Sequence, residues 1–162
     1  MAVDTRLEAR VGELMMARNW TLGTAESCTG GLVMHRLTNV AGSSAYVLGG
    51  VVAYSNQVKQ SQLQVRQGTL MAYGAVSEQV AEEMATGLRA LLHVDVAISI
   101  TGIAGPGGGT AEKPVGLTYI GVAGPNYVLV VRQHVWNGDR EAVKAASAEA
   151  ALALVLEVFG EQ

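Results

Sequence analysis

The pattern of apolar and polar positions changes repeatedly between helical and extended periodicity along the chain. Apolar residues recur at helical spacing over residues 6–17 and over 78–92, where Ser77 precedes the first turn as a suitable N-cap. The alanine-rich stretch 140–159 predicts a third long helix, with Asp139 as its N-cap. Shorter helices or helical turns are expected at 31–38, 56–63 and 69–71.

Short apolar runs between these helices predict strands at 21–24, 45–53 and 94–100. The second and third runs lack alternation, which is typical of strands that are covered on both faces. Gly49 and Gly50 lie in the middle of 45–53 and predict a bulge there.

A hairpin is expected from residues 116–123 and 127–135, joined across Gly124-Pro125-Asn126. No repeat, low-complexity segment or linker divides the chain, so residues 1–162 are interpreted as one domain. Alternating helices and strands then predict an α/β fold, a three-layer α/β/α sandwich on a mixed sheet.

Composition narrows the classes of function. The net charge is −3 and there is no basic run, so a nucleic-acid-binding groove has little support. A single Cys excludes an intramolecular disulfide, residues 1–10 are unlike a signal peptide, and no apolar run reaches the ~18–20 residues needed to span a bilayer. We therefore expect a soluble, cytoplasmic protein without membrane contact.

Residues 24–31 read Thr-Ala-Glu-Ser-Cys-Thr-Gly-Gly and link a predicted strand to a predicted helix. Such junctions bind anions and reactive groups, because the first N–H groups of a helix lack intrahelical partners and the dipole is positive there. In the alternative interpretation, Ser27 or Thr29 caps the helix and Gly30 makes the turn.

A second candidate site combines Ser44 with Tyr54 and Lys59. A desolvated lysine can act as the base that removes the proton of a serine nucleophile. Ser44 lies before the strand 45–53 and Lys59 lies beyond it, so a bend at Gly49-Gly50 is needed to bring them together. Otherwise Ser44 lies in a turn and Lys59 is a solvated helix lysine.

Two further stretches are candidates for ligand contact. Residues 99–109 form a glycine-rich loop that begins at a strand end, without a Walker or dinucleotide-binding fingerprint, and it is a candidate lid or oxyanion loop. Arg140 lies in the first turn of the last helix, where the dipole disfavours a cation unless an anionic ligand faces it. A surface arginine is the alternative.

Metal and thiol chemistry have less support. The three histidines, at 35, 93 and 134, lack metal-ligand spacing, so we expect no metal and no other cofactor. Cys28 lies at a helix start that could lower its pKa, but no His is near it in sequence, which favours a structural role.

The motifs together resemble a known family. They are Ala25–Gly31, Ala41–Ser44, Tyr54-Ser55-Asn56 with Lys59, Gly74–Ser77, Thr101–Pro106, Glu112–Gly116 and Gly138-Asp139-Arg140. In this order they are similar to the nicotinamide-nucleotide amidase family, the carboxy-terminal domain of CinA proteins, over roughly residues 6–156.

The resemblance implies a metal-free Ser/Lys amidase of NAD salvage that converts nicotinamide mononucleotide and water to nicotinate mononucleotide and ammonia. It implies Ser44 as nucleophile, Lys59 as general base and Tyr54 as a proton-transfer or orienting group. Contacts to substrate or oxyanion are implied for Ser27, Thr29, Gly30, Thr101, Gly102 and Arg140.

The resemblance also implies a homodimer and a standalone form of a domain that other members carry behind a second domain. Two other classes remain open. One is a non-catalytic module that binds a pyridine nucleotide, and the other is a cysteine hydrolase that uses Cys28 and is blocked by thiol alkylation.

Overall fold

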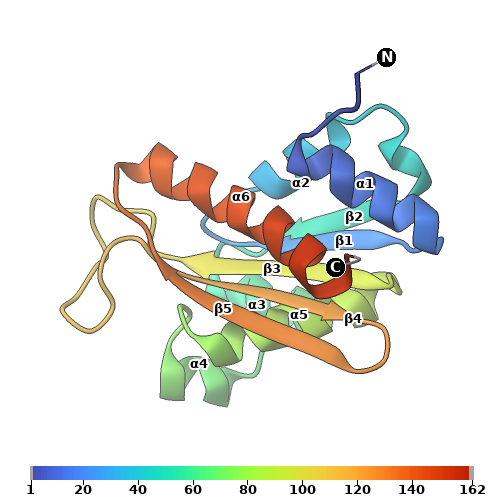
Figure 1. The fold of residues 1–162 in the computed structure, drawn as a ribbon. Coiled ribbons are helices and arrows are strands. Elements are labelled where there is room, and N and C mark those ends of the chain that lie inside the picture. The colour runs from blue at the N-terminus through green and yellow to red at the C-terminus, as the bar shows by residue number, and fades with distance from the viewer. Residues whose placement is uncertain (1, 161–162) are drawn as a thin grey trace.

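The computed structural model of this chain describes residues 2–160, so the two ends of the predicted domain 1–162 lie outside the described residues. Figure 1 shows the order of the elements, which are α1 (Leu7–Arg18), β1 (Leu22–Glu26), α2 (Leu32–Thr38), η1 (Ser43–Ala45), β2 (Val47–Val52), α3 (Asn56–Leu63), α4 (Gln67–Tyr73), α5 (Glu78–Leu92), β3 (Val96–Gly102), β4 (Leu117–Gly124), β5 (Val128–Val135) and α6 (Arg140–Phe159). Within these residues, no helix combines the length and the apolar character that a bilayer crossing requires.

The five strands form one mixed sheet in the order β2-β1-β3-β4-β5. β1 runs parallel to β2 and β3, whereas β4 is antiparallel to both β3 and β5. Helices α1, α2 and α6 cover one face, and α3, α4 and α5 lie on the other (Figure 1). The predicted α/β/α sandwich on a mixed sheet and the predicted β4–β5 hairpin are confirmed.

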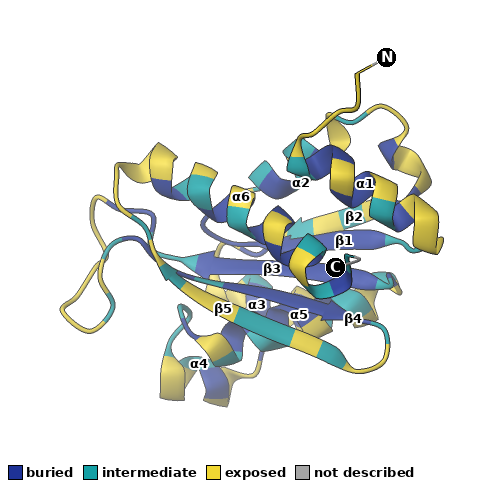
Figure 2. Cartoon of the chain, in the orientation of Figure 1, coloured by how far each residue is buried: buried dark blue, intermediate teal, exposed yellow. Residues whose placement is uncertain are grey.

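The core has two parts, one on each face of the sheet. The larger part lies between the sheet and α1, α2 and α6, and the smaller part lies between the sheet, α3 and α5. Every residue of β1 and all but the last of β3 are buried, as the dark central strands in Figure 2 show. The prediction of a strand covered on both faces is therefore confirmed for β3.

The same prediction is wrong for β2. It is an edge strand whose residues alternate between half-buried and exposed, and Leu48 and Val52 are 54% and 50% exposed. Apolar composition alone does not distinguish an edge strand from a central one. The predicted bulge does occur: Leu22 pairs with Val47 and Gly23 with Gly49, so Leu48 is the extra residue.

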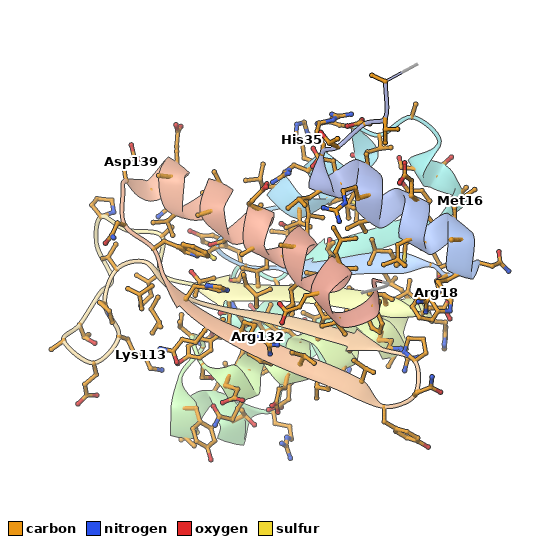
Figure 3. The ribbon with its side chains drawn as sticks, viewed as in Figure 1. Met16, Arg18, His35, Lys113, Arg132 and Asp139 are labelled. Atoms are coloured by element: carbon orange, nitrogen blue, oxygen red, sulfur yellow. The ribbon has the colours of Figure 1, made fainter. Side chains whose placement is uncertain are left out.

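The two long helices begin and end where the sequence predicts, and the N-caps expected at their starts form. Ser77 Oγ accepts a hydrogen bond from the Val80 N–H at the start of α5. Asp139 Oδ1 accepts one from the Ala142 N–H at the start of α6 (Figure 3 labels Asp139 there). α4 is longer than the predicted turn at 69–71.

Helix α3 lies against α5 at a point where α5 has no side chain. A Cβ atom on Gly87 would lie 1.8 Å from the carbonyl oxygen of Leu63, the last residue of α3. The backbone of α3 therefore rests directly on α5. This contact sets how near α3 comes to α5, and α3 carries Lys59.

Candidate active site

A cavity of about 300 Å³ lies at the carboxyl ends of β1 and β3, next to the start of α6. This is the edge at which open α/β sheets place their ligands, and the volume is at the lower end of the ~300–1,000 Å³ of small-molecule sites. Its lining comes from five segments: Ser27 and Cys28; Tyr54, Asn56 and Lys59; Ala75 and Val76; Thr101–Gly105 with Gly107 and Gly108; and Arg140.

Lys59 is the most unusual side chain of this cavity, because it is only 2% exposed. α3 directs it back toward the sheet, where its Nζ lies 3.0 Å from Ser27 Oγ, 2.9 Å from the Ala53 carbonyl oxygen and 3.4 Å from that of Tyr54. Within residues 2–160 no carboxylate forms an ion pair with it. Burial lowers the pKa of Lys59 from its ordinary value.

Three oxygen atoms surround Lys59 Nζ, and each is placed to accept an N–H from it: the two carbonyl oxygens and Ser27 Oγ. The neutral amine that burial favours has only two N–H groups and one lone pair, and the Ser27 hydroxyl is the one partner of the three that can itself donate a proton. With both N–H groups donated to carbonyls, the lone pair is left for the hydroxyl proton of Ser27. The arrangement can therefore deprotonate Ser27.

Ser44 does not lie in this cavity, and the expected pairing of Ser44 with Lys59 is wrong. Ser44 is exposed in η1, before β2, whereas Lys59 follows the other end of that strand. A strand of six residues at ~3.3 Å per residue separates the two ends by roughly 20 Å. The bulge at Leu48 does not fold the strand back, because β2 stays in register with β1 as far as Val52.

The parallel pairing of β1 and β2 explains why Ser27 takes the place expected for Ser44. Glu26, the last residue of β1, lies opposite Val52, the last residue of β2. The residues that follow both strands therefore leave the sheet side by side. Ser27 comes directly after β1, and the chain beyond β2 enters α3, which carries Lys59.

The N-terminus of α2 is not free to bind an anion. The Glu26 carboxylate accepts hydrogen bonds from the Val33 and Met34 N–H groups, at 2.9 and 3.1 Å, and from the Thr29 hydroxyl at 2.7 Å. Neither Ser27 nor Thr29 caps the helix, so both earlier interpretations of this junction need correction. Thr29 is buried and supports the turn, in which Gly30 has a φ of +62°.

Cys28 lies beside Ser27 and also lines the cavity. Its thiol is buried, and burial raises its pKa to about 11, the opposite of the lowering expected for a helix start. Because the thiolate is the nucleophilic form of cysteine, this thiol is poorly suited to attack. The observation weighs against the cysteine-hydrolase alternative.

Two residues at the end of β3 meet the cavity opposite Ser27. Thr101 is 1% exposed, and its hydroxyl donates a 2.8 Å hydrogen bond to the Ala75 carbonyl oxygen. Its own lone pairs are left as acceptors toward the cavity. At Gly102, a Cβ atom would lie 3.1 Å from Cys28 Sγ and 2.8 Å from Thr118 Oγ1, so the close packing of β3 leaves little space for a side chain.

Arg140, the first residue of α6, reaches across the cavity mouth. Its Nη1 donates a 2.7 Å hydrogen bond to the Gly105 carbonyl oxygen, and its Nη2 donates a 3.1 Å bond to the Tyr54 hydroxyl. No carboxylate within residues 2–160 forms an ion pair with it. Its positive charge is therefore not neutralised, and Tyr54, 63% exposed, stands beside it at the entrance.

Several residues of the site carry no assignment from sequence reasoning alone. Asn56, Val76, Ile103 and Ala104 line the cavity, and the family motifs that contain them are the signal that could have indicated them. Glu26 could have been found as a carboxylate at the end of an otherwise apolar strand. Among the described residues, no three His, Cys, Asp or Glu side chains are grouped as metal ligands would be.

Sequence comparison finds relatives that match most of the chain. The chain is 46% identical over 94% of its length to nicotinamide-nucleotide amidohydrolase PncC of Enterobacter agglomerans, of which it covers 93%. It is 50% identical over 96% of its length to a CinA-like protein of Chloroherpeton thalassium. The chain spans only 38% of that relative, and similar shares, 36% and 33%, of relatives in Moorella thermoacetica and Halothermothrix orenii.

Solved structures agree with the sequence relatives. The competence/damage inducible protein CihA of Agrobacterium tumefaciens superposes with a TM-score of 0.92 at 37% identity, covering 98% of this chain and 99% of that one. A CinA superfamily protein of Klebsiella pneumoniae gives 0.90 at 38% identity, covering 94% and 95%. Residues 4–159 match the profile of the CinA C-terminal domain, and the chain belongs to that family.

Proposed function

We propose that this protein hydrolyses the carboxamide of nicotinamide mononucleotide, with Ser27 as the nucleophile and Lys59 as its general base. The observation that carries the proposal is the 3.0 Å contact between Lys59 Nζ and Ser27 Oγ at the floor of the cavity. An amide is a poor electrophile with a poor leaving group, so its hydrolysis needs an activated hydroxyl and a proton for the departing nitrogen. A buried neutral lysine supplies both.

In the first half of the reaction, Ser27 Oγ attacks the carboxamide carbon and its proton passes to Lys59 Nζ. The tetrahedral intermediate collapses when the C–N bond breaks. Lys59 returns the proton to the leaving nitrogen, which departs as ammonia and leaves an ester on Ser27. The two carbonyl oxygens bonded to Nζ hold the amine in place and stabilise the ammonium form that exists between the two transfers.

In the second half, Lys59 takes a proton from water, whose oxygen attacks the ester carbon. The bond to Ser27 Oγ breaks, and the proton on Nζ returns to the serine. The acid that forms gives up its proton to the released ammonia, so the products are the carboxylate of nicotinate mononucleotide and an ammonium ion. One water is consumed, and the enzyme returns to its starting protonation state.

The other cavity residues fit substrate binding. Thr101 Oγ1, whose proton is donated to Ala75, is available to accept an N–H of the carboxamide, which the carboxylate product lacks. Arg140 has no carboxylate partner and suits the phosphate of a mononucleotide. Tyr54 connects Arg140 with Lys59, because the Tyr54 hydroxyl accepts a hydrogen bond from Arg140 while the Tyr54 carbonyl oxygen lies 3.4 Å from Lys59 Nζ.

The name of the Enterobacter agglomerans relative, nicotinamide-nucleotide amidohydrolase, supports the same substrate class. The test is release of ammonia and nicotinate mononucleotide from nicotinamide mononucleotide by the purified chain, with a chelator present. Turnover that persists in chelator and disappears in Ser27→Ala supports the proposal. Tight binding of the mononucleotide without any turnover would identify a non-catalytic binding module instead.

The proposal also includes two expectations from the sequence, a location that follows from composition and a dimer that the family resemblance implies. We expect the protein to work in the cytoplasm and to form a homodimer. Sedimentation equilibrium of the purified chain measures the second property directly, and a single species with the mass of one chain would contradict it.

A further inference from the structure

Lys144 is a half-buried lysine on α6, one helical turn after Arg140. Residues four apart on a helix lie on the same face, with ~5–6 Å between their Cβ atoms. Lys144 therefore lies on the same face of α6 as Arg140, which points to the cavity mouth, although Lys144 itself is not among the residues that line the cavity. A Cβ atom built on Gly30 would lie 3.8 Å from Lys144 Nζ, so the ammonium lies over the turn that follows Ser27.

The three lysines of the chain differ in what their ammonium groups contact. Lys59 Nζ contacts Ser27 and two carbonyl oxygens, and Lys113 donates to the Tyr73 carbonyl oxygen. For Lys144, no hydrogen bond or ion pair is formed with any residue in the range 2–160. The Lys144 ammonium is half-buried, faces a glycine turn and has no acceptor among the described residues, so it is suited to bind an anionic ligand.

Three carboxylates are close to Lys144, either along α6 or through the Gly30 turn. Glu141, three residues before Lys144 on α6, forms no ion pair with it among the described residues. Glu26, four residues before Gly30, accepts four hydrogen bonds, from the Thr24 and Thr29 hydroxyls and from two N–H groups of α2. Asp139 caps α6 through the Ala142 N–H. None of the three neutralises Lys144, whose charge extends far enough into the site to favour the thiolate form of Cys28, against the larger effect of burial.

We propose that Lys144 and Arg140 together form a two-cation clamp that holds the phosphate monoester of the substrate above the Gly30 turn. This inference rests on the proposed function for the identity of the substrate. The absence of a side chain at Gly30 leaves space for a phosphate oxygen between the turn and the ammonium. Lys144 would thus determine the preference for a mononucleotide over the corresponding nucleoside.

The first experiment measures kcat and KM for nicotinamide mononucleotide and for nicotinamide riboside, which lacks the phosphate. Lys144→Met, which retains the apolar stem, is expected to raise KM for the mononucleotide about tenfold, the lower end of what a hydrogen bond to a charged group contributes. It should leave kcat, and both constants for the riboside, within about twofold. Lys144→Arg should recover most of the affinity.

Arg10→Ala is the matched control, because it removes one positive charge from an exposed position on α1 outside the cavity. An equal rise of KM for mononucleotide and riboside in Lys144→Met would overturn the clamp, and so would an effect no larger than that of Arg10→Ala.

A binding measurement separates failure of the clamp from failure of the proposed function. Nicotinamide mononucleotide and inorganic phosphate are each titrated, by calorimetry, into proteins with and without Lys144→Met. Both proteins also carry Ser27→Ala when the mononucleotide is used, so that it is not consumed during the measurement. About tenfold weaker binding of both ligands to the Lys144→Met proteins supports the clamp even if no ammonia is ever released. Equal affinities with and without Lys144 overturn it even if the amidase activity is present.

Discussion

Ser27 and Ser44 lie in turns of similar composition, small hydroxyl residues next to glycine, yet the two turns have different surroundings. Ser27 is buried after β1 and lies 3.0 Å from the lysine amine, whereas Ser44 is exposed before β2. The difference comes from strand direction. Because β1 and β2 are parallel, their carboxyl ends lie side by side, and their amino ends lie together at the opposite end of the strands. Which end of a strand a serine occupies therefore decides whether it can react.

The largest expected effect is that of Ser27→Ala, and Ser44→Ala is the variant to compare it with. Ser27→Ala should lower kcat by at least about a thousandfold, since loss of a catalytic nucleophile commonly costs several orders of magnitude. Ser44→Ala should remain within about twofold of the wild type, because an exposed turn residue at the far end of β2 contacts nothing in the cavity. Ammonia release from nicotinamide mononucleotide measures both, and the reverse ranking would break the comparison.

The second effect concerns Lys59, which lies near Ser27 and far from Ser44. Lys59→Arg should reduce kcat about as severely as Lys59→Ala, because a guanidinium does not give up its proton near neutral pH. In the wild type, the neutral amine is the active form, so kcat/KM should rise with pH through the lowered pKa of Lys59. A pH–rate profile for the three proteins tests this, and a working arginine variant would show that the side chain only positions Ser27.

The third effect is on binding. Arg140→Ala removes a charge-assisted contact worth ~1.5–3 kcal/mol, so KM for the mononucleotide should rise by roughly 10- to 150-fold. The rise should be much smaller for nicotinamide riboside, and kcat should change little. Equal losses on both substrates would place Arg140 in support of the Gly105 loop, to which it also donates, and not at the phosphate.

The smallest effect is expected at Cys28. Because its thiol is buried and its pKa is raised to about 11, iodoacetamide near neutral pH should leave activity unchanged over the time in which an exposed thiol reacts. Cys28→Ala should retain activity within a few fold, with some loss of thermal stability from the small cavity that it opens. Rapid inactivation by the reagent, prevented by Cys28→Ala, would restore the thiol as a functional group.

Sequence reasoning was most successful where local chemistry alone determines structure. The starts of α5 and α6 follow from Ser77 and Asp139, whose side chains cap the helix that begins directly after them. Lys59, Thr101 and Arg140, whose roles the family resemblance implies, line one cavity, because the segments that follow β1, β2 and β3 and the start of α6 meet at the same end of the sheet.

The failures share one physical cause, which is that spacing along the chain does not give the position of a strand in the sheet. β2 is as apolar as a central strand, and the sequence does not show that it forms an edge. For the same reason Ser44 was expected to pair with Lys59, whereas in the structure Ser27 does so. The capping of α2 by Glu26 was missed because the carboxylate precedes the helix by several residues and reaches it through the turn.

The direct contact between α3 and Gly87 has a consequence for how this protein tolerates change. An alanine there would place its methyl carbon 1.8 Å from the Leu63 carbonyl oxygen, so α3 would have to move away from α5. Lys59 would move with it, and a displacement of ~1 Å in a reacting group can cost about a hundredfold in rate. Gly87 contacts no substrate and bears no reactive atom, yet the space that it leaves open sets the position of the catalytic base. A substitution on the face of α5 that meets α3 therefore also changes the active site.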